Sequence, residues 1–205
     1  MVETFDHLAH QILLLAINPR TGELRSERRL WVVTAAAVLA ELVLQERVRL
    51  RAGKVEVRDS RPFEDPVLDV MLSDLASRPA RSPIRITADP RETYLNQTLA
   101  ELVANGWVRL TPKYGISKAQ YVVLDAERLN GAKVVAAHGL RDPAGASDRE
   151  AYLAGFASQL GLTRELASEL PFGQRLRVKR LLTERSWVNE AVGEVFKLTV
   201  QLDRI

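Results

Sequence analysis

Apolar positions recur at the helical period through most of this chain, and only two stretches replace that period by strict alternation. The first periodic stretch covers residues 4–16. Residues 27–45 are apolar around nearly the whole circumference of the helix they would form, which is typical of a helix buried on most sides. We therefore predict that residues 27–45 form a central helix, with Ser26 as its N-cap.

The two alternating stretches predict β-hairpins. In the first, a turn at Ala52-Gly53 separates four apolar residues that we expect to form one buried face: Val48, Leu50, Val55 and Val57. The second covers residues 108–125, "VRLTPKYGISKAQYVVLD". Solvent-facing turns favour Gly, Asn, Asp and Ser. This turn instead carries an aromatic and a β-branched residue between two lysines: Lys113, Tyr114, Ile116 and Lys118.

Further periodic stretches predict helices over most of the remaining chain. One begins at about Pro66, and the others are expected at 91–105, 126–137, 148–160, 163–170 and, as one or two helices, between 174 and 199. Residues 78–91 form a connector rich in proline and arginine, and the breaks at 141–148 and 171–174 are too short for flexible linkers. We predict a mostly α fold over residues 1–205: a single helical-bundle domain around a central buried helix, with two small β-hairpins.

Composition narrows the class of protein. The chain of 205 residues has no cysteine, which excludes disulfides, thiolate metal sites and a cysteine nucleophile. Its longest apolar run, Leu30–Leu44, contains Glu41 and falls short of the roughly 20 residues that cross a bilayer. The first residues are acidic and polar, unlike a secretory signal. We expect a cytoplasmic protein that contacts a membrane only from outside.

Candidate catalytic groups are sparse. His7 and His10 stand three residues apart, a spacing that could hold a metal ion, but no third ligand is near in sequence. We interpret them as exposed histidines near a chain end and predict no metal site. Neither a glycine-rich phosphate loop nor a nucleophile elbow occurs. The sequence therefore predicts a protein that is not an enzyme and uses no cofactor.

The basic residues are more informative. A formal net charge of +3 favours an anionic partner. Arginine side chains and the N–H groups at a helix N-terminus can together bind phosphate. Arginines gather at the start of the central helix and around the 78–91 connector, and they would form an anion pocket if they converge: Arg25, Arg28 and Arg29, and Arg81, Arg85 and Arg91.

Four segments, in their order and spacing, resemble the Golgi phosphoprotein 3 family, including its bacterial members: "ILLLAINPRTGEL", "VLAELVLQERVRL", "PFEDPVLDVML" and "TLAELVANGWVRL". The resemblance extends more loosely to the C-terminal helices and covers about residues 8–198. It implies a mostly α-helical domain that binds membranes peripherally. Eukaryotic members recognise phosphatidylinositol 4-phosphate, and the family hairpin is implicated in membrane insertion and self-association.

The headgroup residues of that family are not kept, because their positions fall on Ser26, Ala35, Glu92 and Leu95. We expect a substitute pocket for an anionic lipid, formed by Arg25, Arg28, Arg29 and Arg91. The 113–118 tip is expected to insert into the membrane. The 108–125 hairpin could also hold a homo-oligomer together.

Two other functions fit the same residues. The 91–105 helix and the following hairpin also resemble a winged helix, in which Lys113 and Lys118 would lie on the wing. Glu92 and Glu101 oppose phosphate, so nucleic acid is the less favoured partner. The other alternative is a dimerising interaction scaffold without a lipid role.

Overall fold

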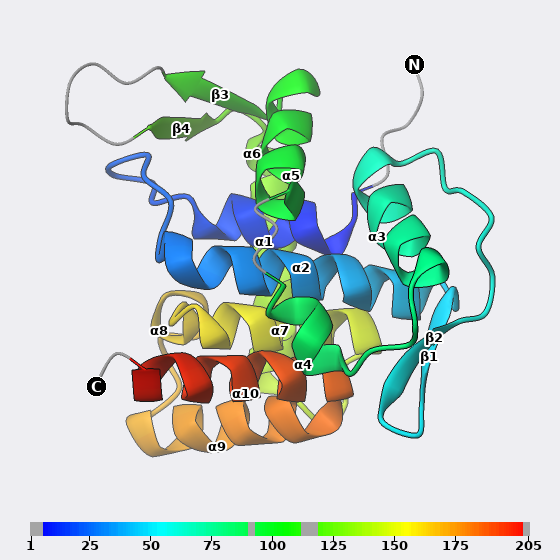
Figure 1. Ribbon diagram of the computed structural model, residues 1–205. Helices are drawn as coiled ribbons and strands as arrows, with labels where there is room; N and C mark the ends of the chain where they lie inside the picture. The colour runs from blue at the N-terminus through cyan, green and yellow to red at the C-terminus, as the bar shows by residue number, and fades with distance from the viewer. Residues whose placement is uncertain (1–5, 90–92, 112–118, 203–205) are drawn as a thin grey trace.

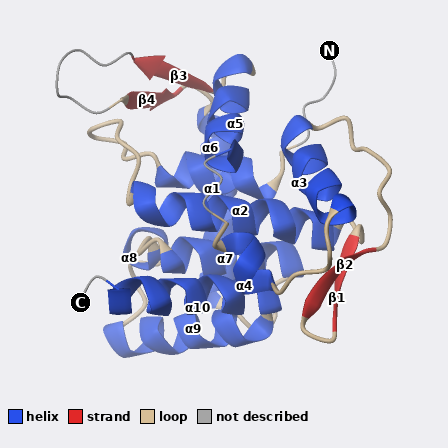
Figure 2. Ribbon diagram, viewed as in Figure 1, coloured by secondary structure: helices blue, strands red, loops and turns tan. Residues whose placement is uncertain are grey.

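A computed structural model describes residues 6–89, 93–111 and 119–202. This part of the chain contains ten helices and two antiparallel two-stranded hairpins (Figures 1 and 2), which confirms the mostly α fold. The helices are α1 (Leu8–Ala16), α2 (Glu27–Leu44), α3 (Pro66–Ser77), α4 (Pro83–Thr87), α5 (Thr93–Ala104), α6 (Ala126–Arg141), α7 (Asp148–Gln159), α8 (Thr163–Leu166), α9 (Phe172–Arg185) and α10 (Trp187–Leu202). The strands are β1 (Val48–Arg51), β2 (Lys54–Val57), β3 (Val108–Thr111) and β4 (Gln120–Val123).

Helix α2 is the predicted central helix. It contacts α1, α3, α5, α7 and α10, and most of its residues are buried (Figure 1). Ser26 occupies the N-cap position as expected, but its backbone is left-handed with φ of 48° and its side chain makes no capping hydrogen bond. The prediction of a single domain over residues 1–205 stays a prediction.

Glu41 is a buried charge in the middle of this apolar core. Its side chain is fully buried, and one carboxylate oxygen accepts a hydrogen bond from the Leu8 backbone N–H at 3.0 Å. The other oxygen accepts from Arg149 Nη2 at 2.6 Å and from Gln45 Nε2 at 3.2 Å. One carboxylate therefore joins α2 to the N-terminus of α1 and to α7, which offsets the cost of burying it.

The first hairpin turns at Ala52-Gly53 as predicted, with both residues at positive φ. Val48 and Val55 are buried, but Leu50 is 38% exposed, so the prediction of one buried face was wrong at this position. The reason is the position of Leu50 near the turn, because the hairpin packs mainly through β2 against α3 and makes fewer contacts through β1 with α2.

Several element boundaries differ from expectation. The 78–91 connector contains α4, which Pro83 begins in a first turn where proline needs no N–H partner. Helix α6 runs beyond the predicted end at residue 137 to Arg141, so Gly139 lies inside it. A Cβ there would approach the Glu150 carbonyl oxygen within 2.5 Å, so glycine allows α6 and α7 to pack closely. Helix α8 ends at Leu166, and α9 begins at Phe172, inside the predicted 171–174 break.

Helix α9 lies at one edge of the bundle (Figure 1) and buries only Val178 and Leu182. Asn189, which is 1% exposed, fixes this helix in place. Its amide nitrogen donates to the backbone carbonyls of Leu182 in α9, at 3.0 Å, and of Ala151 in α7, at 3.2 Å. The end of α9 is thereby tied to both α10 and α7.

Candidate functional site

The two predicted pocket arginines whose side chains can be described turn toward the C-terminal helices. Arg25 forms an ion pair with Glu165 of α8 at 2.7 Å. Arg29 donates to the Gln159 carbonyl at 3.4 Å, and its guanidinium lies 5.5 Å from the centre of the Phe196 ring in α10. The Arg28 side chain, Arg91, Glu92 and the hairpin residues Lys113, Tyr114, Ile116 and Lys118 lie outside the described residues.

The connector arginines are placed differently. Arg81 binds the carboxylates of Asp74 in α3 and Asp89, and its backbone carbonyl accepts the Val55 N–H of β2. Its role is to hold the connector against α3 and the first hairpin. Arg85, on α4, is exposed. Arg25 and Arg81 therefore form ion pairs with acidic residues in different parts of the bundle.

A depression of about 450 Å³ lies between α2, α5 and β4 and includes Leu95, one of the four positions on which the family's headgroup residues fall. Its lining is mostly apolar and carries one acid: Leu24, Glu27, Trp31, Leu95, Asn96, Leu99 and Tyr121. Ala35, on which the family arginine falls, is 1% exposed and belongs to the core. Among the described lining residues the only formal charge is the negative one of Glu27, which opposes a phosphate.

A larger open groove, of about 900 Å³, runs between α9 and α10 and reaches Arg29. Two of its cations are already paired, Arg180 with Glu184 at 2.8 Å and Lys197 with Glu194. The other charged residues that line the groove are two cations, Arg29 and Lys179, and one acid, Glu190. Neither Arg29 nor Lys179 has a carboxylate within 4.0 Å among the residues that can be described.

Partial burial and the neighbouring Arg29 both disfavour the charged form of Lys179. The residue as a whole is exposed, but partial desolvation of its ammonium group and the charge of Arg29 lower the pKa of Lys179. Two cations that repel each other without an intervening carboxylate gain by binding an anion between them. The groove can therefore accept a phosphate or carboxylate group.

The outer surface of α9 adds apolar side chains to these cations. Phe172 is 74% exposed, Leu176 is 57% exposed and Leu181 is 42% exposed. The same helix carries one acidic residue, Glu184, and five basic ones: Arg175, Arg177, Lys179, Arg180 and Arg185. A basic helix with exposed aromatic and leucine side chains is typical of a helix that lies on a membrane surface.

Helix α9 and the second hairpin are far apart. Figure 1 shows β3 and β4 at one end of the bundle and α9 at the opposite end, with α1, α2 and α7 between them. The strands of the second hairpin and the surface of α9 are thus separate candidates for the face that contacts a lipid bilayer.

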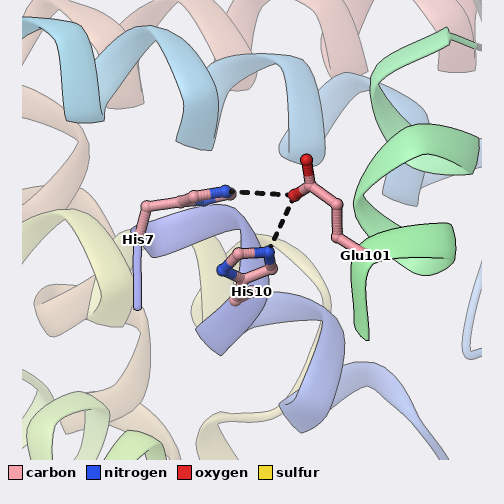
Figure 3. Close-up of side chains that lie close together, drawn as sticks. All are labelled: His7, His10 and Glu101. Atoms are coloured by element: carbon pink, nitrogen blue, oxygen red, sulfur yellow. Dashed lines mark hydrogen bonds and ion pairs between the residues drawn. The ribbon is translucent and has the colours of Figure 1, made fainter. Parts of the chain in front are cut away.

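A second polar cluster lies inside the protein, and it corrects our interpretation of the histidines. His7 and His10 are 0% and 1% exposed, and Glu101 of α5 joins them (Figure 3). His10 Nε2 donates to Glu101 Oε2 at 3.0 Å, while His7 Nε2 lies 3.8 Å from the same oxygen and 3.7 Å from Asp65 Oδ2. The His10 ring also packs edge-on against Trp107. Histidines expected to be exposed and alone are buried beside two carboxylates.

Burial and hydrogen bonding together shift the pKa values of His10 and Glu101. Desolvation lowers the pKa of His10, although Glu101 opposes the shift. Burial alone would raise the pKa of Glu101, but the hydrogen bond from His10 and the proximity of His7 lower it to about 2. A neutral His10 beside an ionised Glu101 is the state expected near neutral pH.

Of the α9 surface and the buried histidine cluster, only the α9 surface could have been predicted from a pattern in the sequence. The segment "FGQRLRVKR", with cations between apolar residues, could have identified α9 as a surface helix. The pairing of His10 with Glu101 joins residues 91 positions apart. Only the packing of α1 against α5 brings them together, and no local pattern reports it.

The chain was compared with protein families and with curated proteins. The family model for Golgi phosphoprotein 3 (GPP34) matches residues 8–199, nearly the whole chain. A comparison with curated proteins gave no match. Of the helices in the described ranges, none is long and apolar enough to cross a membrane.

Proposed function

Because this chain belongs to the Golgi phosphoprotein 3 family, we propose that it is a peripheral membrane-binding protein that recognises anionic lipid. The observation that carries the proposal is the α9 surface, where exposed Phe172 and Leu176 share a helix with Lys179, a groove cation that has no carboxylate within 4.0 Å among the described residues. The proposed activity is binding rather than catalysis.

In this proposal the groove binds the lipid headgroup and the surface of α9 contacts the apolar part of the membrane. Arg29 and Lys179 would bind the phosphate or carboxylate of a lipid headgroup at the groove. Phe172 and Leu176 would enter the interface between headgroups and acyl chains. Burying such a side chain contributes about 1.5–3 kcal/mol, and each cation near an anionic surface adds about 1 kcal/mol. Several such contacts are needed for useful membrane binding.

Exposed apolar residues favour lipid over nucleic acid for this surface. A helix that reads DNA presents polar side chains to the groove edges, whereas Phe172 and Leu176 have no such partner in a duplex. Binding of phosphatidylinositol 4-phosphate itself is a finer expectation from the family. The family's headgroup residues are missing here, so we propose an anionic site without preference for that lipid.

Co-sedimentation with vesicles tests the proposal. We expect the protein to bind phosphatidylcholine vesicles that contain phosphatidylserine and to ignore phosphatidylcholine alone. Addition of phosphatidylinositol 4-phosphate at the same total charge should leave binding unchanged. Binding that does not depend on lipid charge would contradict the proposal, and tighter binding to duplex DNA than to vesicles at equal salt would favour the nucleic-acid alternative.

Matched variants identify the face that binds. Phe172→Ser with Leu176→Ser should weaken binding at least about tenfold, and Lys179→Gln about fivefold. Val134→Ser removes an apolar residue that is 68% exposed on α6, and Lys54→Gln removes a cation on the first hairpin, so both should bind normally. Tyr114→Ser with Ile116→Ser tests the hairpin tip. Loss of binding there, with the α9 variants normal, would move the membrane face to the hairpin.

Light scattering separates lipid binding from self-association. If α9 or the 108–125 hairpin instead formed a homo-oligomer contact, the corresponding double variant would change the mass in solution. A protein whose mass changes while vesicle binding stays normal would support the scaffold alternative.

A further inference from the structure

The buried cluster around His7 has the arrangement of a metal centre, and we propose that His7, His10, Glu101 and Asp65 bind one zinc ion. They come from three separate parts of the chain: the start of α1, α5 and the N-cap of α3. The available ligand atoms are two imidazole Nε2 atoms and two carboxylate oxygens (Figure 3 draws three of these residues). This site is independent of the proposed lipid function and lies in a different part of the molecule.

The spacing of these atoms fits tetrahedral coordination. Zinc binds imidazole nitrogen and carboxylate oxygen at about 2.0–2.2 Å, so neighbouring ligand atoms in a tetrahedron lie about 3.3 Å apart. Glu101 Oε2 lies 3.0 Å from His10 Nε2 and 3.8 Å from His7 Nε2, and His7 Nε2 lies 3.7 Å from Asp65 Oδ2. These three distances bracket the tetrahedral edge. The ligand atoms of His7, His10 and Glu101 all lie within 4.8 Å of one another and form the core of the site. Asp65 lies outside that group and approaches it through His7, so a rotation of its side chain would complete the coordination.

The cluster also leaves buried polar atoms without partners. His7 Nε2 makes no hydrogen bond although its side chain is 0% exposed, and Glu101 Oε1 has none either. Such atoms are nearly always satisfied in proteins. The distances of 3.7 and 3.8 Å from His7 Nε2 are too long for hydrogen bonds. They suit atoms that share a cation between them.

The surrounding structure orients the ligands. Asp65 Oδ1 accepts the N–H groups of Val67 and Leu68 and so caps α3, which leaves Oδ2 directed to His7. Asp65 and Glu101 are 15% and 19% exposed, so an ion could enter between the carboxylates. Ligands held by hydrogen bonds of this kind are the usual support of a metal site.

Zinc binding would change the tautomer of His7. In the structure, Nδ1 of His7 accepts the Ala9 N–H at 3.2 Å, so the neutral ring carries its proton on Nε2. Coordination through Nε2 transfers that proton to Nδ1 and ends the capping hydrogen bond. One weak cap at 3.2 Å is exchanged for a metal–nitrogen bond, and the N-terminal turn of α1 becomes the part of the structure that responds to zinc.

The ligand types select among metal ions. Magnesium and calcium prefer sites made only of oxygen atoms, whereas two imidazoles with two carboxylates suit zinc and neighbouring transition metals. Cobalt(II) can therefore serve as a spectroscopic substitute. A tetrahedral site would give cobalt visible absorption of much greater intensity than the hydrated ion.

Calorimetric titration of untagged, chelator-treated protein with zinc chloride tests the proposal. We expect one ion per chain, a rise in melting temperature on binding, and no response to magnesium. Saturable cobalt absorption displaced by zinc would give the same stoichiometry. The absence of a one-to-one zinc isotherm in the wild-type protein would overturn the proposal, and the cluster would then be a hydrogen-bonded part of the core.

Three variants locate the ion. Glu101→Gln keeps the shape and an oxygen acceptor for His10, so it should fold and weaken zinc binding at least tenfold. His10→Gln should lower the affinity further. The chain has three histidines, and His138→Gln is the matched control because His138 is exposed and pairs with Glu150. Zinc binding that survives in Glu101→Gln but disappears in His138→Gln would place the ion elsewhere and refute the assignment. If His10→Gln does not fold, the wild-type titration and Glu101→Gln still decide.

Discussion

Helix α2 is buried on most sides, whereas helix α9 is exposed on most of its surface. In α2, apolar residues cover nearly the whole circumference, and its buried carboxylate, that of Glu41, is bonded to α1 and α7. In α9, only Val178 and Leu182 are buried, while basic and apolar residues share the exposed surface. In the first helix a charge is tolerated because packing supplies its partners. In the second, Arg175, Arg180 and Arg185 have partners within the protein, whereas Lys179 has no carboxylate within 4.0 Å among the described residues and remains available for binding.

The contrast separates stability from recognition. Changes in α2 should alter the free energy of unfolding, whereas changes on the outer surface of α9 should alter binding and leave folding intact. This difference can be tested by substitutions of the same residue type in both environments.

The largest effect on stability is expected for Glu41→Ala. It leaves the Arg149 guanidinium and the Leu8 N–H without their buried acceptor, and breaking such a pair costs about 3–5 kcal/mol. Urea denaturation measures the change. Glu184→Ala, on the exposed side of α9, is the matched control and should change the free energy of unfolding by less than about 0.5 kcal/mol. Equal effects of the two substitutions would remove the distinction between the helices.

Two leucines within α9 sharpen the comparison. Leu182 is fully buried, so Leu182→Ala should destabilise the protein by about 2–4 kcal/mol. Leu176 is 57% exposed, and Leu176→Ala should stay within about 0.5 kcal/mol of wild type. Thermal unfolding monitored by circular dichroism measures both. A large loss for Leu176→Ala would mean that the outer surface of α9 packs against something in solution.

An acid-dependent effect of intermediate size is expected at α7. Ser147 and Glu150 form a capping box, and hydrogen bonds from the Ser147 backbone N–H and side chain lower the pKa of Glu150 below its ordinary value of 4.5. Because the folded pKa is the lower one, the stabilisation is complete above pH 4.5 and is lost as the pH falls through the folded value. Glu150→Gln should cost about 1 kcal/mol at pH 7. The difference from wild type should shrink in acid, and a constant difference would contradict this origin.

The smallest effect concerns the Arg180–Glu184 pair in α9. Both side chains are largely exposed, and solvent-exposed ion pairs contribute little to stability. A double-mutant cycle with Arg180→Ala and Glu184→Ala should give a small coupling energy that disappears in high salt. A coupling energy as large as the effect of Glu150→Gln, or one that persists in high salt, would show that this part of α9 is less exposed in solution.

Sequence patterns predicted the helices and turns better than they predicted which residues contact each other in the folded protein. Pro66 and Ala52-Gly53 located a helix start and a turn, since both act through local backbone preferences. The burial of the central helix followed from its apolar circumference. The short helix α4 was missed, because five residues within a proline- and arginine-rich connector present too little periodicity.

The candidate sites depended on distant contacts and were predicted less well. Arg29 was selected for its place at the start of the central helix, yet its neighbours Gln159 and Phe196 come from helices far along the chain. His10 was expected to be exposed because nothing near it in sequence indicated that Trp107 and Glu101 would cover it. Only the packing of α1 against α5 could supply that information.

The two hydrogen bonds of Asn189 have a consequence for how α9 could act. A helix that folds on contact with its ligand spends part of the interaction free energy on ordering its own backbone. The Asn189 amide holds the end of α9 to α7 and α10 through contacts made within the protein itself. Its surface is therefore preorganised, and binding would have to immobilise little more than the side chains of Phe172, Leu176 and Lys179. Slow amide hydrogen exchange along the buried side of α9, with or without vesicles, would be the signature of such a rigid platform.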